Sequence, residues 1–111
     1  MFETGSQDHL QITKNKELNM KLEIVTPEAT LLNSEVISVS VPGVNGAFQM
    51  LNNHAPIVSL LIKGNVAFKG GAITIEEEFQ DRFTKQDGEY ILPINSGTIE
   101  MKDNKVIVLA D

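Results

Sequence analysis

The sequence predicts an all-β protein, a flattened antiparallel β-sandwich of about eight to ten short strands. Two observations predict this fold. From residue 20 onward apolar residues recur at every second position, as in Leu22 and Ile24, which places them on one face of a strand. Turn signals such as Pro42-Gly43 and Asp87-Gly88 recur every several residues. Many short strands between frequent turns favour a sandwich or a barrel.

The strand signals follow one another along the chain. Apolar residues alternate with polar ones at 22–24 and 37–41, and Val66 and Phe68 flank Ala67. Such period-two patterns, rich in Val and Ile, suit a pleated surface. The last run, 106–109, is apolar on both faces. Pro93 interrupts another strand, which indicates an edge or a bulge there.

Residues 72–86 carry two conflicting signals. Ile75, Phe79 and Phe83 are spaced four apart, as on a helix, whereas Ile73 and Ile75 fit a strand equally well. We expect a strand at 72–76, followed by a short irregular or helical turn. The acidic residues at 76–78 are interpreted as a solvated face, because contiguous carboxylates do not converge on a metal.

Residues 1–19 differ in composition from the rest and are expected to be a flexible leader or tag. The domain is expected to span 20–111, with Met20 close to a natural start. The short alternation Leu10-Gln11-Ile12 would allow the leader to add a strand to a sheet edge.

Composition excludes several classes of function. The chain has 111 residues, which predicts one domain, and it has no cysteine for disulfides or thiolate chemistry. Its net charge of −6 argues against nucleic acid and anionic membrane surfaces as partners. No apolar run approaches the ~20 residues of a membrane span. We therefore expect a soluble, intracellular protein with no direct lipid insertion.

No catalytic, cofactor or metal site is predicted. His54 has His9 as its only histidine companion, so we expect it to order a turn through its ring nitrogens rather than to act as a base or ligand. Gly43 and Gly46 precede a β-like run, which offers no helix N-terminus to a phosphate. Asn45-Gly46 favours a tight hairpin turn. The loops 43–46 and 52–56 are expected to lie near each other at one end of the sandwich and to present contacts.

The segment 43–64, centred on Asn53-His54-Ala55-Pro56, resembles the central segment of the epsilon subunit of F-type ATP synthases. The resemblance extends in order along the chain, through 21–28, 36–43, 96–101 and 106–111. The sequence departs from the family pattern at Ala47, where an acidic residue is common, and at Gln49, where a glycine is common. Residues 69–88 look like an insertion.

The resemblance implies a non-catalytic rotor subunit that joins the gamma subunit to the polar loops of the c-ring, on the cytoplasmic face of a bacterial inner membrane. It also implies a short form, because the chain ends at Asp111 without the two helices that brake ATP hydrolysis in many relatives. The contact candidates are Gly43, Gly46, Phe48, Met50, Leu51, Asn53, His54, Ala55 and Pro56.

Two other classes of function fit the sequence less well. A free-standing β-sandwich that binds glycans or peptides usually displays exposed aromatic residues, but the chain has no Trp and a single Tyr, Tyr90. A small hydrolase needs a nucleophile and a base within reach of each other, and the sequence offers no such pair.

Overall fold

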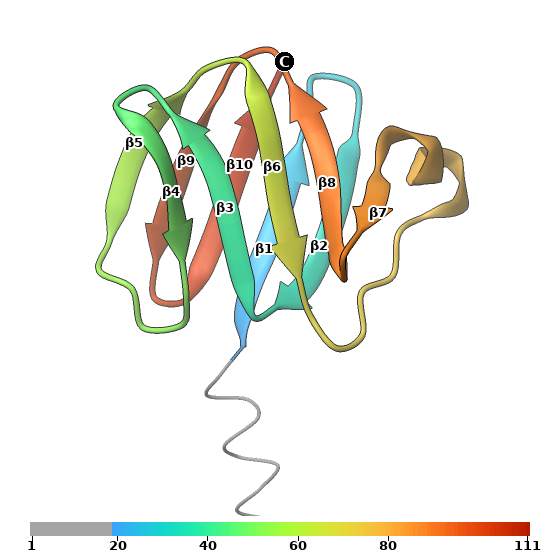
Figure 1. Ribbon diagram of the computed structural model, residues 1–111, viewed down its shortest axis with the longest axis horizontal. Coiled ribbons are helices and arrows are strands. Elements are labelled where there is room, and N and C mark those ends of the chain that lie inside the picture. Colours follow the sequence, from blue (N-terminus) through green and yellow to red (C-terminus); the bar gives the residue numbers. More distant parts are fainter. Residues whose placement is uncertain (1–18) are drawn as a thin grey trace, which may run out of the picture.

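The computed structural model describes residues 19–111 (Figure 1), so the predicted leader lies outside the described residues except for Asn19. The described chain is all-β apart from one 3₁₀ turn, as the sequence predicted. The elements, in order, are β1 (Met20–Val25), β2 (Thr30–Val36), β3 (Ser38–Gly43), β4 (Gly46–Met50), β5 (Ile57–Leu61), β6 (Gly64–Lys69), η1 (Glu77–Arg82), β7 (Thr84–Gln86), β8 (Glu89–Ile94), β9 (Gly97–Lys102) and β10 (Lys105–Ala110).

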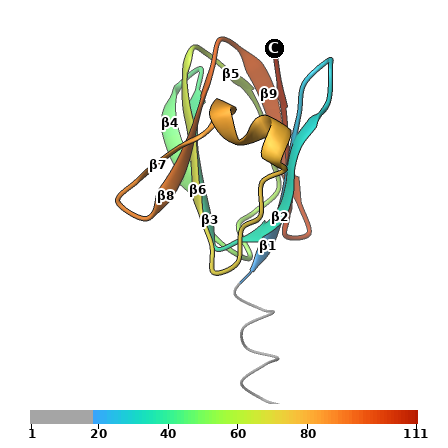
Figure 2. The same cartoon turned by 90° about the vertical axis from the view of Figure 1, so that its right-hand side faces the viewer.

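One strongly curled sheet of ten strands forms both layers of the sandwich. Its order is β2-β1-β10-β9-β5-β3-β6-β8-β7, with β4 paired to β3. Figure 2 shows the half that contains β3, β6 and β8 facing the half that contains β1 and β2. All pairs are antiparallel except β1 with β10, which run parallel. This parallel pair, which was not predicted from the sequence, joins the first strand to the last.

The core lies between the two layers and is made by the period-two residues of the strands. Leu22 and Ile24 of β1, Val106 and Val108 of β10, and Phe68 of β6 are fully buried. Tyr90 stacks on Phe68 with 5.7 Å between ring centroids. The single tyrosine is therefore partly buried packing, and not an exposed aromatic platform of the kind a glycan-binding module presents.

The segment between β6 and β8 closes the open side of the curled sheet, between β2 and β8 (Figure 2). The strand predicted at 72–76 is wrong: these residues are irregular, and only the predicted helical turn forms, as η1. Ile73, Ile75, Phe79 and Phe83 are partly buried against the core. The apolar residues at this spacing therefore cover the open side of the core, and the segment takes an irregular shape that fits this gap.

Pro93 lies in β8 opposite Asn65 of β6. The other side of β8 is paired to β7 only through residues 89–91. Pro93 therefore lies where β8 is an edge, as predicted, so its missing N–H leaves no ladder bond unmade.

The two loops predicted to lie together are at opposite ends of β4 (Figure 1). The β3–β4 turn is at one end, and the loop 51–56 between β4 and β5 is at the other, about 14 Å away along a five-residue strand. The prediction was wrong because the residues between the loops are paired to β3 as a full strand. A straight strand carries its two flanking loops to opposite edges of the sheet.

Candidate partner-binding surfaces

The β3–β4 turn forms the first end of β4. Gly43 pairs with Gly46, so Val44 and Asn45 are the turn residues, one position earlier than the predicted Asn45-Gly46 pair. Gly46 has φ of 119°, a conformation that glycine adopts without strain. The Val44 N–H donates to the Leu60 carbonyl at 3.0 Å. This bond holds the turn against the end of β5.

Gly43 is required by packing. A Cβ at this position would lie 2.7 Å from Cε1 of Phe48 and 2.8 Å from the Gly46 carbonyl oxygen. Phe48 itself is partly buried against the core. These two predicted contact residues therefore shape the turn from within.

The loop 51–56 forms the second end of β4 and carries most of the predicted contact residues. Leu51, Asn53, Ala55 and Pro56 are exposed and His54 is half-buried. The His54 N–H donates to the Leu51 carbonyl at 3.2 Å, and an Nδ1–H of its ring donates to the Ala55 carbonyl at 2.8 Å. The ring orders the turn, as the sequence analysis expected.

Met50 is fully buried, which separates it from the other predicted contact residues. It closes β4 and packs in the core beside the exposed Leu51. Its burial makes it a packing residue and removes it from the side chains that a partner can touch.

A reciprocal pair of hydrogen bonds fastens the loop 51–56 to the β9–β10 turn. The Asn53 N–H donates to Oδ1 of Asn104 at 2.6 Å. The Asn104 side-chain amide donates to Oδ1 of Asn53 at 3.3 Å. Asn104 was not among the predicted residues, because nothing in the sequence distinguishes an asparagine that bonds to a distant loop from any other asparagine in a turn.

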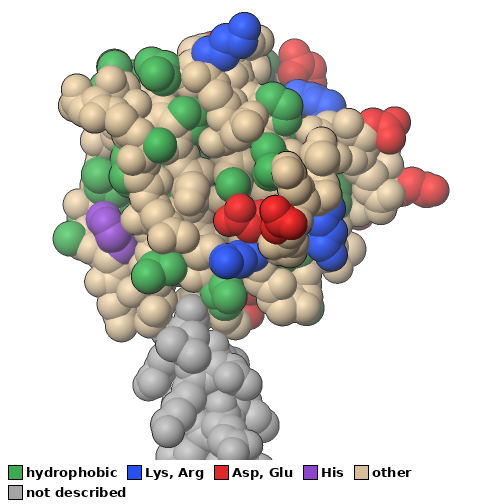
Figure 3. Space-filling model, viewed as in Figure 1, with side chains coloured by type: hydrophobic (Ala, Val, Ile, Leu, Met, Phe, Trp, Pro, Cys, Tyr) green, Lys and Arg blue, Asp and Glu red, His purple; other side chains and the backbone are tan. Residues whose placement is uncertain are grey.

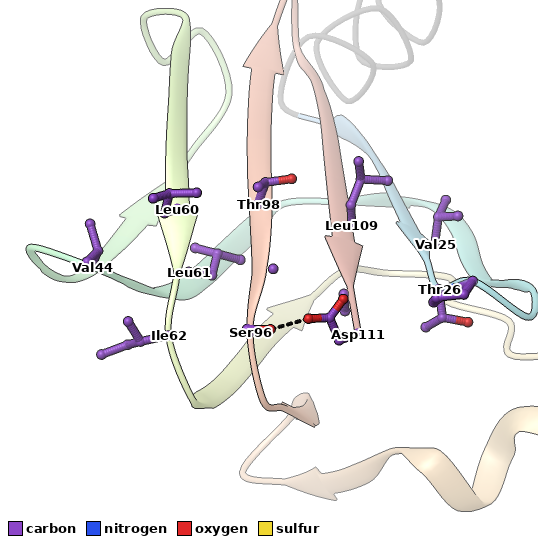
Figure 4. Close-up of a pocket in the computed structure, with 13 residues that line it drawn as sticks. Val25, Thr26, Val44, Leu60, Leu61, Ile62, Ser96, Thr98, Leu109 and Asp111 are labelled. Atoms are coloured by element: carbon purple, nitrogen blue, oxygen red, sulfur yellow. Dashed lines mark hydrogen bonds between the residues drawn. The ribbon is translucent and has the colours of Figure 1, made fainter.

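A row of three apolar side chains and one threonine crosses the outer face of the sheet near the β3–β4 turn. The register places Leu60 of β5 beside Thr98 of β9, Thr98 beside Leu109 of β10, and Leu109 beside Val25 of β1. Figure 4 shows the four side chains in line, with Val44 and Ile62 at one end. They line a shallow depression of about 660 Å³. We call this surface the apolar face.

The apolar face is exposed and uncharged at its centre. Leu60 is 62% exposed and Leu109 is 51% exposed, and Val58, one step along β5, is 76% exposed. At its margin the Ser96 hydroxyl donates to the Asp111 carboxylate. The sequence held one signal of this surface: the run 106–109 is apolar on both faces, although the core accepts one face only.

Charge is distributed unevenly over the surface. Figure 3 shows hydrophobic and uncharged side chains over β3, β4 and β5, whereas acidic side chains gather on the side of η1 and β7. Among residues 19–111, no group of three or more His, Asp and Glu side chains is placed to hold a metal ion. The same residues contain no helix long and apolar enough to cross a membrane.

The family model of the ATP synthase delta/epsilon chain β-sandwich domain matches residues 19–111. The chain belongs to this family. A relative from Campylobacter concisus, an ATP synthase epsilon chain, is 40% identical over 92 residues, which cover 83% of this chain and 60% of the relative. The ATP synthase epsilon chain of Chlorobium limicola is 33% identical over 91 residues, which cover 82% of this chain and 88% of that one.

The fold of this delta/epsilon family member is also found in a solved structure. A chain in the cryo-EM structure of the Tetrahymena thermophila mitochondrial ATP synthase central stalk and c-ring matches with a TM-score of 0.61 at 13% identity, over 82% of this chain and 62% of that one. At such low identity the likeness shows the shared sandwich alone. The chain spans about 60% of the length of the Campylobacter relative.

Proposed function

We propose that the chain is the non-catalytic epsilon subunit in the central stalk of a bacterial F1Fo ATP synthase, where it joins the gamma subunit to the c-ring. Family membership and the epsilon chains of the bacterial relatives support this function. The observation that carries it is the apolar face. A small domain with a complete core and a second exposed apolar row is built to be covered by another protein.

The apolar face is the proposed contact with gamma. Val25, Leu109 and Leu60 lie on β1, β10 and β5 of one sheet, with Thr98 of β9 between Leu109 and Leu60, so a partner surface can be complementary to them without reordering the backbone. Burying a Val or Leu side chain contributes about 1.5–3 kcal/mol. Several such residues around one depression supply the dry centre that a stable interface needs.

The loop 51–56 is the proposed contact with the polar loops of the c-ring. It lies at the far end of β4 from the turn that borders the apolar face (Figure 1). Its exposed atoms are a mixture of Leu51, Pro56 and polar asparagine groups, which suits a polar, hydrogen-bonded partner. A subunit with its two contacts at different ends can link two neighbours. Gly43, Gly46 and Phe48 support the gamma side of this arrangement by shaping the turn.

The proposed place of the chain is peripheral, on the cytoplasmic face of a bacterial inner membrane, as part of the F1 sector. Its mechanism is mechanical: a packed sandwich deforms little under load, so it keeps gamma and ring in register while torque passes. The proposal assigns nucleotide chemistry and ion transport to other subunits.

The test is a binding measurement with purified gamma subunit and the Leu60→Asp/Leu109→Asp double variant. Both residues are more than half exposed, so the change in folding stability should be within about 0.5 kcal/mol for each. Affinity for gamma should fall about 30-fold or more, because two apolar contacts are replaced by desolvated charges.

The matched control is Ile37→Asp. Ile37 is an exposed apolar residue, 43% accessible, that lies outside the apolar face. It should leave gamma binding unchanged. Equal affinity of the double variant and the control for gamma would overturn the assignment of the apolar face.

A further inference from the structure

Two asparagines with left-handed backbone, each in a different turn, are hydrogen-bonded to each other. Asn53 has φ of 64° and Asn104 has φ of 60°, a conformation in which asparagine is favoured over most residues. They exchange the hydrogen bonds of 2.6 and 3.3 Å described above. Two turns that are 51 residues apart in sequence are thus joined by side-chain amide chemistry.

Asn104 is itself anchored to the sheet. Its carbonyl accepts a hydrogen bond from the Lys21 N–H at 2.9 Å, at the start of β1. Its turn closes the β9–β10 ladder, in which Lys102 pairs with Lys105. Asn104 therefore connects the start of β1, the β9–β10 turn and the loop 51–56, which we call the His54 loop.

The His54 loop, residues 51–56, combines bonds within the loop with a bond to another turn. The bonds from the His54 N–H to the Leu51 carbonyl and from the His54 ring to the Ala55 carbonyl lie within the loop and order it internally. The Asn53–Asn104 pair joins the loop to another element, the β9–β10 turn. We infer that Asn104 is a positioning residue, which holds the His54 loop in the orientation in which it meets its partner.

This inference rests on the proposed contact between the loop and the c-ring. The side chain at position 104 has to supply an acceptor for the Asn53 N–H and a donor for the Asn53 Oδ1. Asparagine supplies both from a backbone with positive φ. Aspartate would set a carboxylate oxygen against Asn53 Oδ1, and glycine would keep the turn but lose both bonds.

The experiment uses the full chain and the Asn104→Gly variant. Glycine accepts the positive φ, so the turn and the fold are retained. The control is Asp87→Gly, which removes another side chain with positive φ, 53°, from the β7–β8 turn. By amide hydrogen exchange, Asn53 should exchange about tenfold faster in Asn104→Gly than in the wild type or the control, because its acceptor is gone.

The same variants are then bound to detergent-purified c-ring and, separately, to gamma. Asn104→Gly should weaken binding to the ring about 3- to 10-fold and leave gamma affinity unchanged, which a general loss of folding would not do.

Three results contradict the inference in distinguishable ways. Unchanged exchange of the Asn53 amide shows that the pair does not hold the loop. Lost protection with unchanged ring affinity, while His54→Ala still weakens the ring, shows that the pair does not position the contact. No effect on the ring from either His54→Ala or Asn104→Gly removes the proposed ring contact itself, and the role of Asn104 with it.

Discussion

The two ends of β4 are built by opposite means. At one end the β3–β4 turn is shaped by backbone: two paired glycines, one with positive φ, and ladder bonds to β5. At the other end the loop 51–56 is shaped by side chains, namely the His54 ring and the amide pair of Asn53 and Asn104. The first end borders an apolar surface, and the second presents polar groups.

This difference suits the two unlike contacts proposed for the domain. A backbone-built turn stays rigid beside a dry interface, where a single misplaced polar atom is costly. A loop built from side-chain hydrogen bonds offers donors and acceptors that a wet interface can use. The strand between the two ends keeps them about 14 Å apart.

The largest expected effect is at Met50, where β4 passes from the core into the His54 loop. Met50→Ala removes a fully buried side chain and should lower the free energy of unfolding by about 2–5 kcal/mol, because a cavity remains. Denaturant unfolding measures the loss. Gln49→Ala, at the neighbouring exposed position, should change stability by less than about 0.5 kcal/mol. Similar values for the two variants would show that this end of β4 is not packed as described.

A smaller loss is expected at the backbone-built end. Gly43→Ala places a Cβ 2.8 Å from the Gly46 carbonyl oxygen, which cannot move without opening the turn, and should cost about 1–3 kcal/mol. Gly71→Ala is the matched control, since its added Cβ meets nothing within 4 Å. Thermal unfolding of both variants decides the matter. A Gly43→Ala protein as stable as Gly71→Ala would contradict the close approach.

The smallest effect on stability is expected at the side-chain-built end. His54→Ala breaks the ring's hydrogen bond to the Ala55 carbonyl at a half-buried site, and should cost no more than about 1 kcal/mol. The variant should also bind the c-ring more weakly, because the loop that carries the proposed contact is less ordered. The affinity is measured by binding of the variant to surface-immobilised c-ring, and Thr84→Ala on the distant β7 is the control. Unchanged binding to both ring and gamma would show that His54 has no contact role.

Much of the fold was predictable because the strands obey one local rule. Leu22, Ile24, Val106 and Val108 alternate in sequence and are all buried, since period two alone assigns a face. The same rule gave a wrong prediction for residues 72–76. Ile73 and Ile75 alternate too, but they form no strand and instead pack against the core from an irregular segment.

The proposed contact surfaces follow from the sequence only in part. His54 and its neighbours became candidates because the motif around them resembles a family segment. Leu60, Leu109 and Val25 were missed, because they come from three strands that are far apart in sequence and adjacent only through the sheet register. Asn104 was missed for the same reason.

By itself the sequence determined the all-β class, most strand positions and the family resemblance, because these depend on local periodicity and on short motifs. The tertiary structure decided which residues share a surface. Strand pairing is set by long-range hydrogen bonds and by closure of the core, and these placed the two loops of the 43–64 segment at opposite ends, joined β1 to β10 in parallel, and brought Asn53 to Asn104.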